Sequence, residues 1–167
     1  MDSKIAKVAL AMMQKNSGDI RRIEHSLKVY GYAQLLGVAE SLNEKTLEIL
    51  ELTALLHDIG IHVAEKKYAK SASHYQETEG PPVARDILTS LEFNPETVDR
   101  VCFIISKHHT FTAVDGVDFQ LLVEADFLVN STEDHMTDHQ IIHFAKNIFR
   151  SESGFIYLRK LFPSIEI

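Results

Sequence analysis

A histidine and an aspartate stand side by side, His57-Asp58, directly after the apolar run 54–56. Such a run is typical of a buried helix, so both polar side chains are delivered to the protein interior. Burying an imidazole and a carboxylate is costly unless something pairs with them. A metal ion is one such partner, since this ligand pair suits Mn, Fe, Zn or Mg. The alternative is a helix that simply ends in a polar turn, with Gly60 stopping it.

Three further segments place metal-binding side chains on apolar helical stripes. These side chains are His25, then His108 or His109, then Asp126. Each shares the helical spacing of the apolar residues before it or after it, so each is expected to face the core. A lone inward histidine is more often a hydrogen-bonded core residue, but aspartate is almost never fully buried unpaired. Together with His57-Asp58, these groups predict a shared metal centre that keeps positions open for water and substrate.

The elements that must position these groups are all predicted to be helices. The periodicity predicts helices over 3–15, 19–37, 44–58, 81–92, 95–109 and 117–130, and two more within 133–162 separated near 151–154. No strand pattern of any length occurs, so the fold class is all-α, in a single domain over 1–167. His135, His139 and His143 are interpreted as one solvated or partner-facing side of a C-terminal helix.

The polar segment 61–79 lacks periodicity and is interpreted as a long loop. Loops of this length are often functional lids or binding loops, and the alternative is a disordered surface loop. Gly80-Pro81-Pro82 is expected to end the segment, because proline suits the first turn of the helix that follows.

Composition excludes several classes of protein. The 167 residues are 45% hydrophobic and 25% charged, the profile of a soluble globular domain. A net charge of −7 makes nucleic acid an unfavourable partner. No apolar run reaches membrane-spanning length, and the first residues lack the pattern of a signal peptide. The single cysteine, Cys102, excludes an intramolecular disulfide and fits a reducing compartment, so we expect a cytoplasmic protein.

The order His25, then His57-Asp58, then Asp126 resembles the HD superfamily of metal-dependent phosphohydrolases. The resemblance covers about residues 20–130 and is carried by the stretches 21–27, 55–60, 107–110 and 124–127. It implies a single-domain helical bundle of the HD type, with the C-terminal helices at 133–162 added to it. It also implies that His25, His57, Asp58 and Asp126 bind a first divalent metal, with Asp58 able to bridge to a second.

The sequence departs from many members of that superfamily at two positions, one of which is Ile61, where many members have lysine directly after the stretch 57–60. At the other position, many two-metal members carry a further histidine four residues before the glycine that opens the fourth helix, and here that position is Gln76. A neutral amide oxygen is a poor ligand for a borderline metal. We therefore expect one tightly held ion of Mn, Fe, Mg, Ni or Zn and at most a weaker second site. His109 is the first candidate ligand for the second site, and His108 is the next.

The resemblance implies hydrolysis at phosphorus in a nucleotide or another small phosphate ester. Asp58 would orient or deprotonate the attacking water, and His108 and Lys67 would contact the phosphate. Two other classes stay open: a metal-containing nucleotide-binding or regulatory protein with little turnover, and a helical interaction module without metal. A homodimer is also left open, and neither nucleic acid nor a membrane is expected as a partner.

Overall fold

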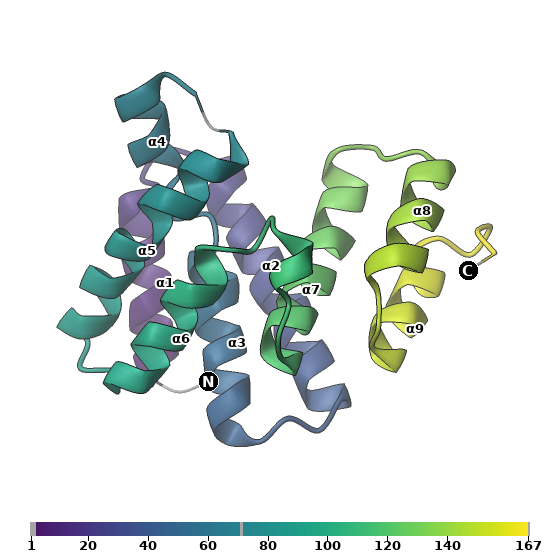
Figure 1. The fold of residues 1–167 in the computed structure, drawn as a ribbon, viewed down its shortest axis with the longest axis horizontal. Helices are drawn as coiled ribbons and strands as arrows, with labels where there is room; N and C mark the ends of the chain where they lie inside the picture. Colours follow the sequence, from purple (N-terminus) through teal and green to yellow (C-terminus); the bar gives the residue numbers. More distant parts are fainter. Residues whose placement is uncertain (1–2, 71, 167) are drawn as a thin grey trace.

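The computed structural model describes residues 3–70 and 72–166, and this part of the chain is helical without strands (Figure 1). The elements are α1 (Ser3–Lys15), α2 (Ile20–Ala39), α3 (Glu44–Leu56), α4 (Ile61–Tyr68), α5 (Ser73–Ser90), α6 (Pro95–Ile105), the 3₁₀ turn η1 (Phe111–Ala113), α7 (Val117–Glu133), α8 (Asp138–Ile148) and α9 (Glu152–Leu161). The all-α, single-domain prediction is confirmed. None of these described helices is both long and apolar enough to cross a membrane.

The helix α3 is the central element of the bundle. It packs against α1, α2, α6 and α7, and its residues from Ile49 to Leu56 include no exposed side chain. A helix that is apolar nearly all round can be stable only when neighbours cover every side of it. Because α3 is enclosed in this way, the residues that follow it, His57 and Asp58, enter the interior as well.

Side-chain caps fix where several helices begin. Asp19, Asn43, Asn94, Thr137 and Ser151 each accept a hydrogen bond from a backbone N–H in the first turn of the helix that follows. Such caps satisfy donors that have no partner inside the helix. The beginnings of α2, α3 and α6 therefore agree with the predicted helix starts to within one residue.

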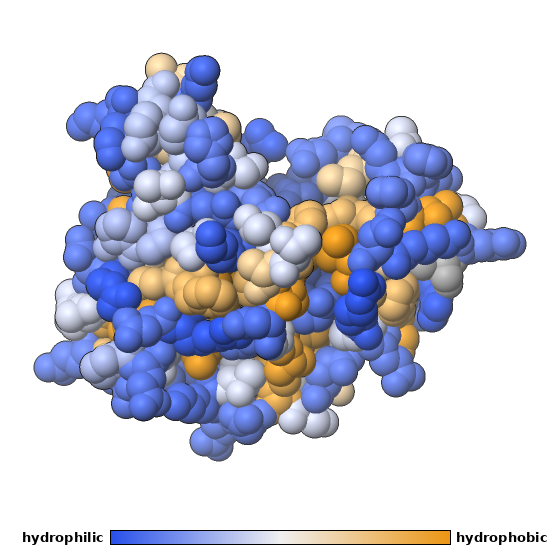
Figure 2. All heavy atoms as spheres, in the orientation of Figure 1, coloured by the Kyte–Doolittle hydropathy of each residue, from blue (hydrophilic) through white to orange (hydrophobic). Residues whose placement is uncertain are grey.

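The predicted loop over 61–79 is wrong. Residues 61–68 form α4 and residues 73–79 form the first turns of α5, while residue 71 lies outside the described residues; α4 packs chiefly against α5 at the edge of the bundle (Figure 1). Only Ile61 and Ala64 of α4 are buried. A helix with so narrow a buried side carries too few apolar residues to show a period, which is why the pattern was absent from the sequence. Figure 2, in the same orientation, shows the surface hollowed between the α4 end and the turn that joins α7 to α8.

The prolines do not end that segment either, because Pro81 and Pro82 lie inside α5. Proline lacks a backbone N–H, so each removes one helical hydrogen bond. Close packing holds the helix there instead. A Cβ atom on Gly60 would lie 2.4 Å from the backbone nitrogen of Gly80, and one on Gly80 would lie 2.7 Å from Ile105 Cγ2. Two glycines thus let α5 pack directly on the turn that follows His57.

The C-terminal histidines are all exposed, as expected of a solvated side, but the prediction that they share one helix is wrong. His135 lies between α7 and α8 with a φ of 49°, whereas His139 and His143 are exposed on α8. The C-terminal pair of helices begins at Asp138, because Glu133 still belongs to α7.

The fully buried Glu124 holds the connection between α8 and α9 in place. Its carboxylate accepts hydrogen bonds from the backbone N–H of Arg150 at 2.7 Å and of Ser151 at 3.1 Å.

We predict that Gly60→Ala lowers the free energy of unfolding by about 1–3 kcal/mol, because its methyl group would meet backbone atoms that have no room to move. Gly31→Ala on α2 is the matched control, since no described atom lies within 4 Å of a Cβ there. The control should be neutral or raise stability by up to about 1 kcal/mol through helix propensity. Urea unfolding measures both variants, and equal stabilities would contradict the close approach of α5 to this turn.

Candidate metal centre

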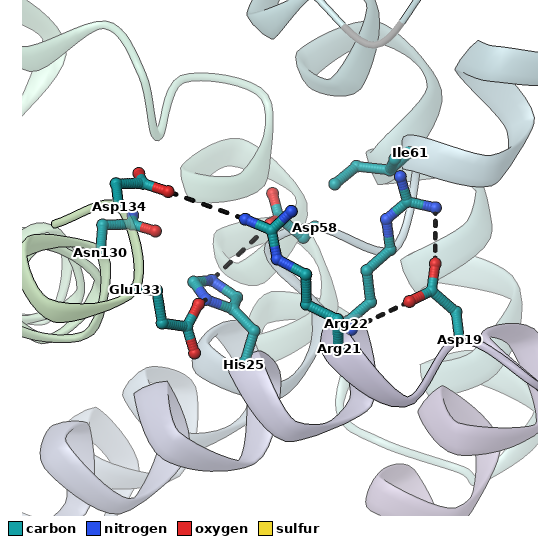
Figure 3. A pocket seen from close by; sticks show the side chains of 9 residues that line it. All are labelled: Asp19, Arg21, Arg22, His25, Asp58, Ile61, Asn130, Glu133 and Asp134. Carbon is teal, nitrogen blue, oxygen red and sulfur yellow. Dashed lines mark hydrogen bonds and ion pairs between the residues drawn. The ribbon is translucent and has the colours of Figure 1, made fainter.

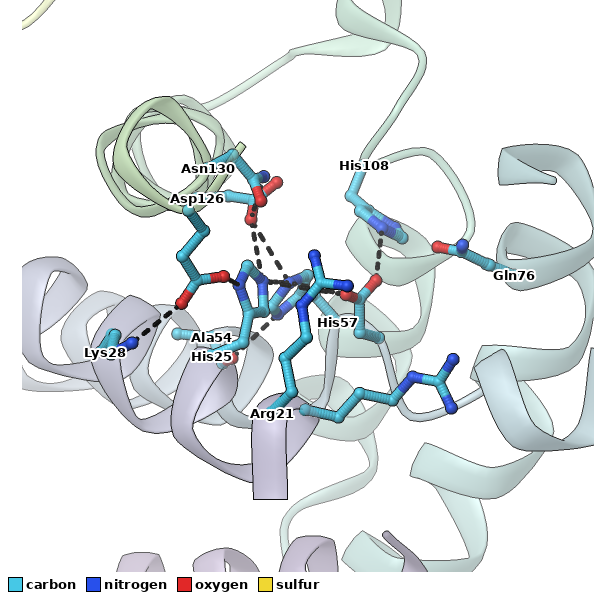
Figure 4. Close-up of polar contacts among 12 residues, drawn as sticks. Arg21, His25, Lys28, Ala54, His57, Gln76, His108, Asp126 and Asn130 are labelled. Carbon is cyan, nitrogen blue, oxygen red and sulfur yellow. Dashed lines mark hydrogen bonds and ion pairs between the residues drawn. The ribbon is translucent and has the colours of Figure 1, made fainter. Parts of the chain in front are cut away.

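Side chains from two helices and the turn that follows α3 converge on one small space near the hollowed surface. His25 comes from α2, His57 and Asp58 follow α3, and Asp126 comes from α7 (Figures 3 and 4). The Nε2 atoms of His25 and His57 lie 3.3 Å apart. Asp126 Oδ1 lies 3.2 Å from the first and 3.5 Å from the second. Asp58 Oδ2 is 3.6 Å from His57 Nε2 and 3.8 Å from His25 Nε2, so every predicted first-metal ligand is in this cluster.

Each buried histidine is oriented by a hydrogen bond from its other ring nitrogen. His57 Nδ1 donates to the Ala54 carbonyl at 2.9 Å, and His108 Nδ1 donates to the Ile105 carbonyl at 2.8 Å. His25 Nδ1 donates to Glu133 Oε2 at 2.9 Å. A carbonyl or carboxylate oxygen can only accept, so Nδ1 carries the proton in each neutral ring. The Nε2 lone pairs then point into the cluster, the arrangement that metal-binding histidines have.

These residues fit a divalent cation. Without one, two Nε2 lone pairs oppose each other at 3.3 Å beside two carboxylates. Among the described residues, Asp58 Oδ1 and His108 Nε2 are also buried without a hydrogen-bond partner. Buried polar atoms normally have partners, and an ion is one explanation when they do not. Imidazole nitrogens with carboxylate oxygens form a mixed ligand set suited to the transition metals and to zinc.

The electrostatics of the cluster also favour positive charge. Burial disfavours the imidazolium form of His57, but the carboxylates of Asp58 and Asp126 outweigh it and raise its pKa to about 9. Burial would likewise raise the pKa of Asp58 and of Asp126, but the neighbouring imidazoles hold both pKa values well below the usual range. The two carboxylates are therefore ionised at neutral pH, as metal ligands must be.

A second group shares Asp58 with the first. His108 and His109 offer ligand atoms that lie, together with one from Asp58, within 4.8 Å of one another. The predicted helix over 95–109 is too long, since α6 ends at Ile105 and both histidines lie in the turn after it. His109 Nε2 donates to Gln76 Oε1 at 3.0 Å, and burial, with the nearby His108, lowers the pKa of His109 to about 4. His109 is thus neutral and already engaged by the residue that replaces the usual histidine.

Two residues that hydrogen-bond to the cluster were not predicted from the sequence, and both are on α7. Asn130 Nδ2 donates to Asp126 Oδ1 at 2.9 Å. Glu133 accepts from His25, and it also accepts from Lys28 Nζ at 3.0 Å. With Asp126 they form an i, i+4, i+7 series on one helix face, and that spacing is the signal that could have identified them.

Two cavities open onto the cluster, and they share Asp58, Asn130 and Asp134. The first, of about 270 Å³, is lined by Arg21 and Arg22 (Figure 3). Arg22 is already paired with Asp19 at 2.9 Å and Glu65 at 2.6 Å. Arg21 is 79% exposed, and its guanidinium lies 3.7 Å from Asp134. Arg21 was not among the phosphate contacts predicted from the sequence. Because its side chain is exposed and has one long ion pair, it can turn toward a ligand more easily than Arg22.

The second cavity, of about 350 Å³, is lined by His109 and Asp126 and by several apolar residues. Lys67, the predicted phosphate contact, is absent from the described lining of both cavities. It pairs instead with Glu79 at 2.8 Å, which raises the pKa of its ammonium group. Its assignment as a substrate contact stays a prediction.

We predict that Asp58→Asn removes the bound metal and lowers the melting temperature of the metal-loaded protein, because a ligand of the folded state stabilises it by mass action. Asp99→Asn is the control, since Asp99 is 67% exposed and paired with Arg85 on the surface. Elemental analysis of protein purified without a chelator measures the metal content. Full metal content in Asp58→Asn would contradict the assignment.

Elemental analysis also tests how many metal ions each chain binds. We expect one metal per chain after extensive dialysis, both in the wild type and in His109→Ala, because His109 Nε2 is already bonded to Gln76. A second metal, where present, should be lost on dialysis. Two metals per chain surviving dialysis in the wild type would show that the site around His109 is as strong as the first.

A family comparison agrees with this geometry. Residues 22–142, more than half of the chain, match the family model described as the HD domain. No match was found among curated proteins or among solved structures. The matched region contains every residue of the two clusters described above. The chain belongs to the HD domain family of metal-dependent phosphohydrolases.

Proposed function

We propose that this protein hydrolyses nucleotides or other small phosphate esters with the help of a divalent metal. One observation carries the proposal: three imidazole Nε2 atoms and two carboxylates face one buried space that opens onto two cavities. His25, His57, Asp58 and Asp126 would hold the metal, and His109 is the first candidate for a second site. A cation held there would make water a stronger acid and offset negative charge on a phosphoryl group.

Asp58 has the central role among the protein's own groups in this mechanism. Its Oδ1 is buried without a hydrogen-bond partner among the described residues, so it is available to accept a proton from water. The water oxygen would then form a bond to phosphorus while the bond from phosphorus to the ester oxygen breaks, and the proton held by Asp58 would pass to the departing ester oxygen. His108 Nε2 lies 3.5 Å from Asp58 Oδ1, so its ring lies beside the attacking water and is a candidate contact for the phosphate.

The first cavity adds a group for the phosphate. Arg21 lies at its edge with an exposed guanidinium, whereas the carboxylates of Asp19 and Glu65 already neutralise Arg22. A planar guanidinium binds phosphate through two parallel hydrogen bonds. Arg21 would therefore leave Asp134 and bind the phosphate, and Arg22 would position the start of α2 against α4.

One observation favours the alternative of a metal-containing protein that binds a nucleotide with little turnover. His109 donates to Gln76, so the second group has one imidazole engaged by an amide and holds a metal less firmly. An HD domain with a weak second site can retain ligand binding without efficient chemistry.

A panel of phosphate esters, assayed with Mn, Fe, Mg, Ni and Zn added separately, tests the function. We expect the wild type to release phosphate from at least one ester and Asp58→Asn to release none, because Asp58 serves both metal and water. Asp99→Asn should retain wild-type rates. Nucleotide binding without hydrolysis under any metal would favour the regulatory alternative, and neither binding nor hydrolysis would contradict both.

The two candidate phosphate contacts are separated by Arg21→Ala and Lys67→Ala. We expect Arg21→Ala to raise KM about tenfold, the effect of losing one charge-assisted hydrogen bond. Lys67→Ala should have the smaller effect, because its pair with Glu79 must break before it contacts a phosphate. Steady-state kinetics with metal content measured in parallel decides this. A larger KM change in Lys67→Ala would show that α4 supplies the contact.

A further inference from the structure

One side of the second cavity is an aromatic wall, formed by Phe111 of η1, Phe144 of α8 and Met136 of the connection before α8. The ring of Phe144 stacks on Phe127 of α7, with centroids 3.8 Å apart and planes 4° from parallel. Phe111 meets Phe144 edge to face, with centroids 5.3 Å apart. Figure 2 shows apolar surface on the face of the molecule where α7 and α8 lie in Figure 1. Because Phe127 is buried, it fixes the wall in place.

The metal-binding cluster lines the same cavity. Asp58, His109 and Asp126 all line it. A phosphate ester that places its phosphorus at the cluster must therefore extend its organic group either into this cavity or into the arginine-lined one. Carboxylates line both cavities, but the apolar lining differs: the arginine-lined cavity has Ile61, whereas the second has Phe111, Val123, Phe127, Met136 and Phe144.

The chemistry of the wall discriminates between organic groups. Aromatic rings and a methionine offer flat, polarisable surface, on which a planar ring stacks favourably. The hydroxyl groups of a sugar or of glycerol would lose water against the wall without gaining a hydrogen bond from it. Phe111 is 39% exposed although it is a large apolar residue, so burying it against a ligand would be favourable.

We propose that the aromatic wall determines substrate specificity by selecting phosphate esters whose organic group is a planar ring of the nucleobase kind. This inference rests on the proposed hydrolase function, because it assumes that phosphorus lies at the cluster. It narrows the substrate class from small phosphate esters in general to esters of nucleosides and related ring compounds.

The test compares a purine nucleoside monophosphate with glycerol phosphate, an ester without a ring. We expect Phe111→Ala to raise KM for the nucleoside ester about tenfold, the effect of losing one base–aromatic contact. KM for glycerol phosphate should change less than twofold, and Phe111→Tyr, which keeps a ring, should restore the nucleoside KM. Phe103→Ala is the matched control: Phe103 is also 39% exposed, and it lies outside the described lining of the cavity.

A binding measurement separates failure of this inference from failure of the proposed function. Where the wild type hydrolyses no ester, the nucleoside monophosphate should still raise its melting temperature, and that of Phe103→Ala, more than that of Phe111→Ala. Equal thermal shifts in all variants, or equal KM changes for both esters in Phe111→Ala, would overturn the role of the wall. A wild type that hydrolyses both esters with equal kcat/KM would overturn it as well.

Discussion

Unfavourable contact between buried polar groups is the constraint on which the arrangement of this protein depends. His25 and His57 direct Nε2 atoms at each other across 3.3 Å, and Asp58 and Asp126 direct carboxylate oxygens into the same space. His57 is almost fully buried, and the side chains of Asp58 and Asp126 are only 21% and 19% exposed, which is too little to solvate all of these groups. Only positive charge between them makes the arrangement favourable, either as protons on the imidazoles or as a metal ion. Replacing protons by a divalent cation keeps that balance of charge.

The helices around the cluster act as a frame for it. α3 is enclosed on all sides and ends where His57 and Asp58 begin, so the core itself sets the position of the central pair. The glycine contact between Gly60 and Gly80 then brings α5 against the following turn. Through α5, Gln76 and Glu77 reach the turn after α6: Glu77 accepts from the backbone N–H of His109 at 3.0 Å. The positions of the metal ligands are therefore coupled to the packing of helices distant in sequence.

The helix α7 links the cluster to both cavities. One face carries Asp126, Asn130 and Glu133 toward the histidines, while Phe127 supports Phe144 on the other side of the second cavity. A small rotation of α7 would move the metal ligand Asp126 together with Phe127, the ring on which Phe144 of the aromatic wall stacks. The helix α7 thus positions both a metal ligand and the ring that supports the aromatic wall. This double role is a reason why most residues of α7 are buried.

Several helices of this protein, and the residues that face inward from them, were predictable from local sequence patterns. Helix periodicity and capping depend on residues within one or two turns, so α2, α3, α6 and α7 could be located, and the inward spacing of His25 and Asp126 could be recognised. Features that depend on packing between segments distant in the sequence could not be predicted in this way. The place of Pro81 inside α5, the pairing of Lys67 with Glu79 and the hydrogen bond of His25 to Glu133 each depend on contacts that no local period encodes. The sequence alone determined which residue types face inward from each helix. The tertiary structure decided which of them meet, because the approach of helices is set by side-chain volume and by glycine contacts across the whole core.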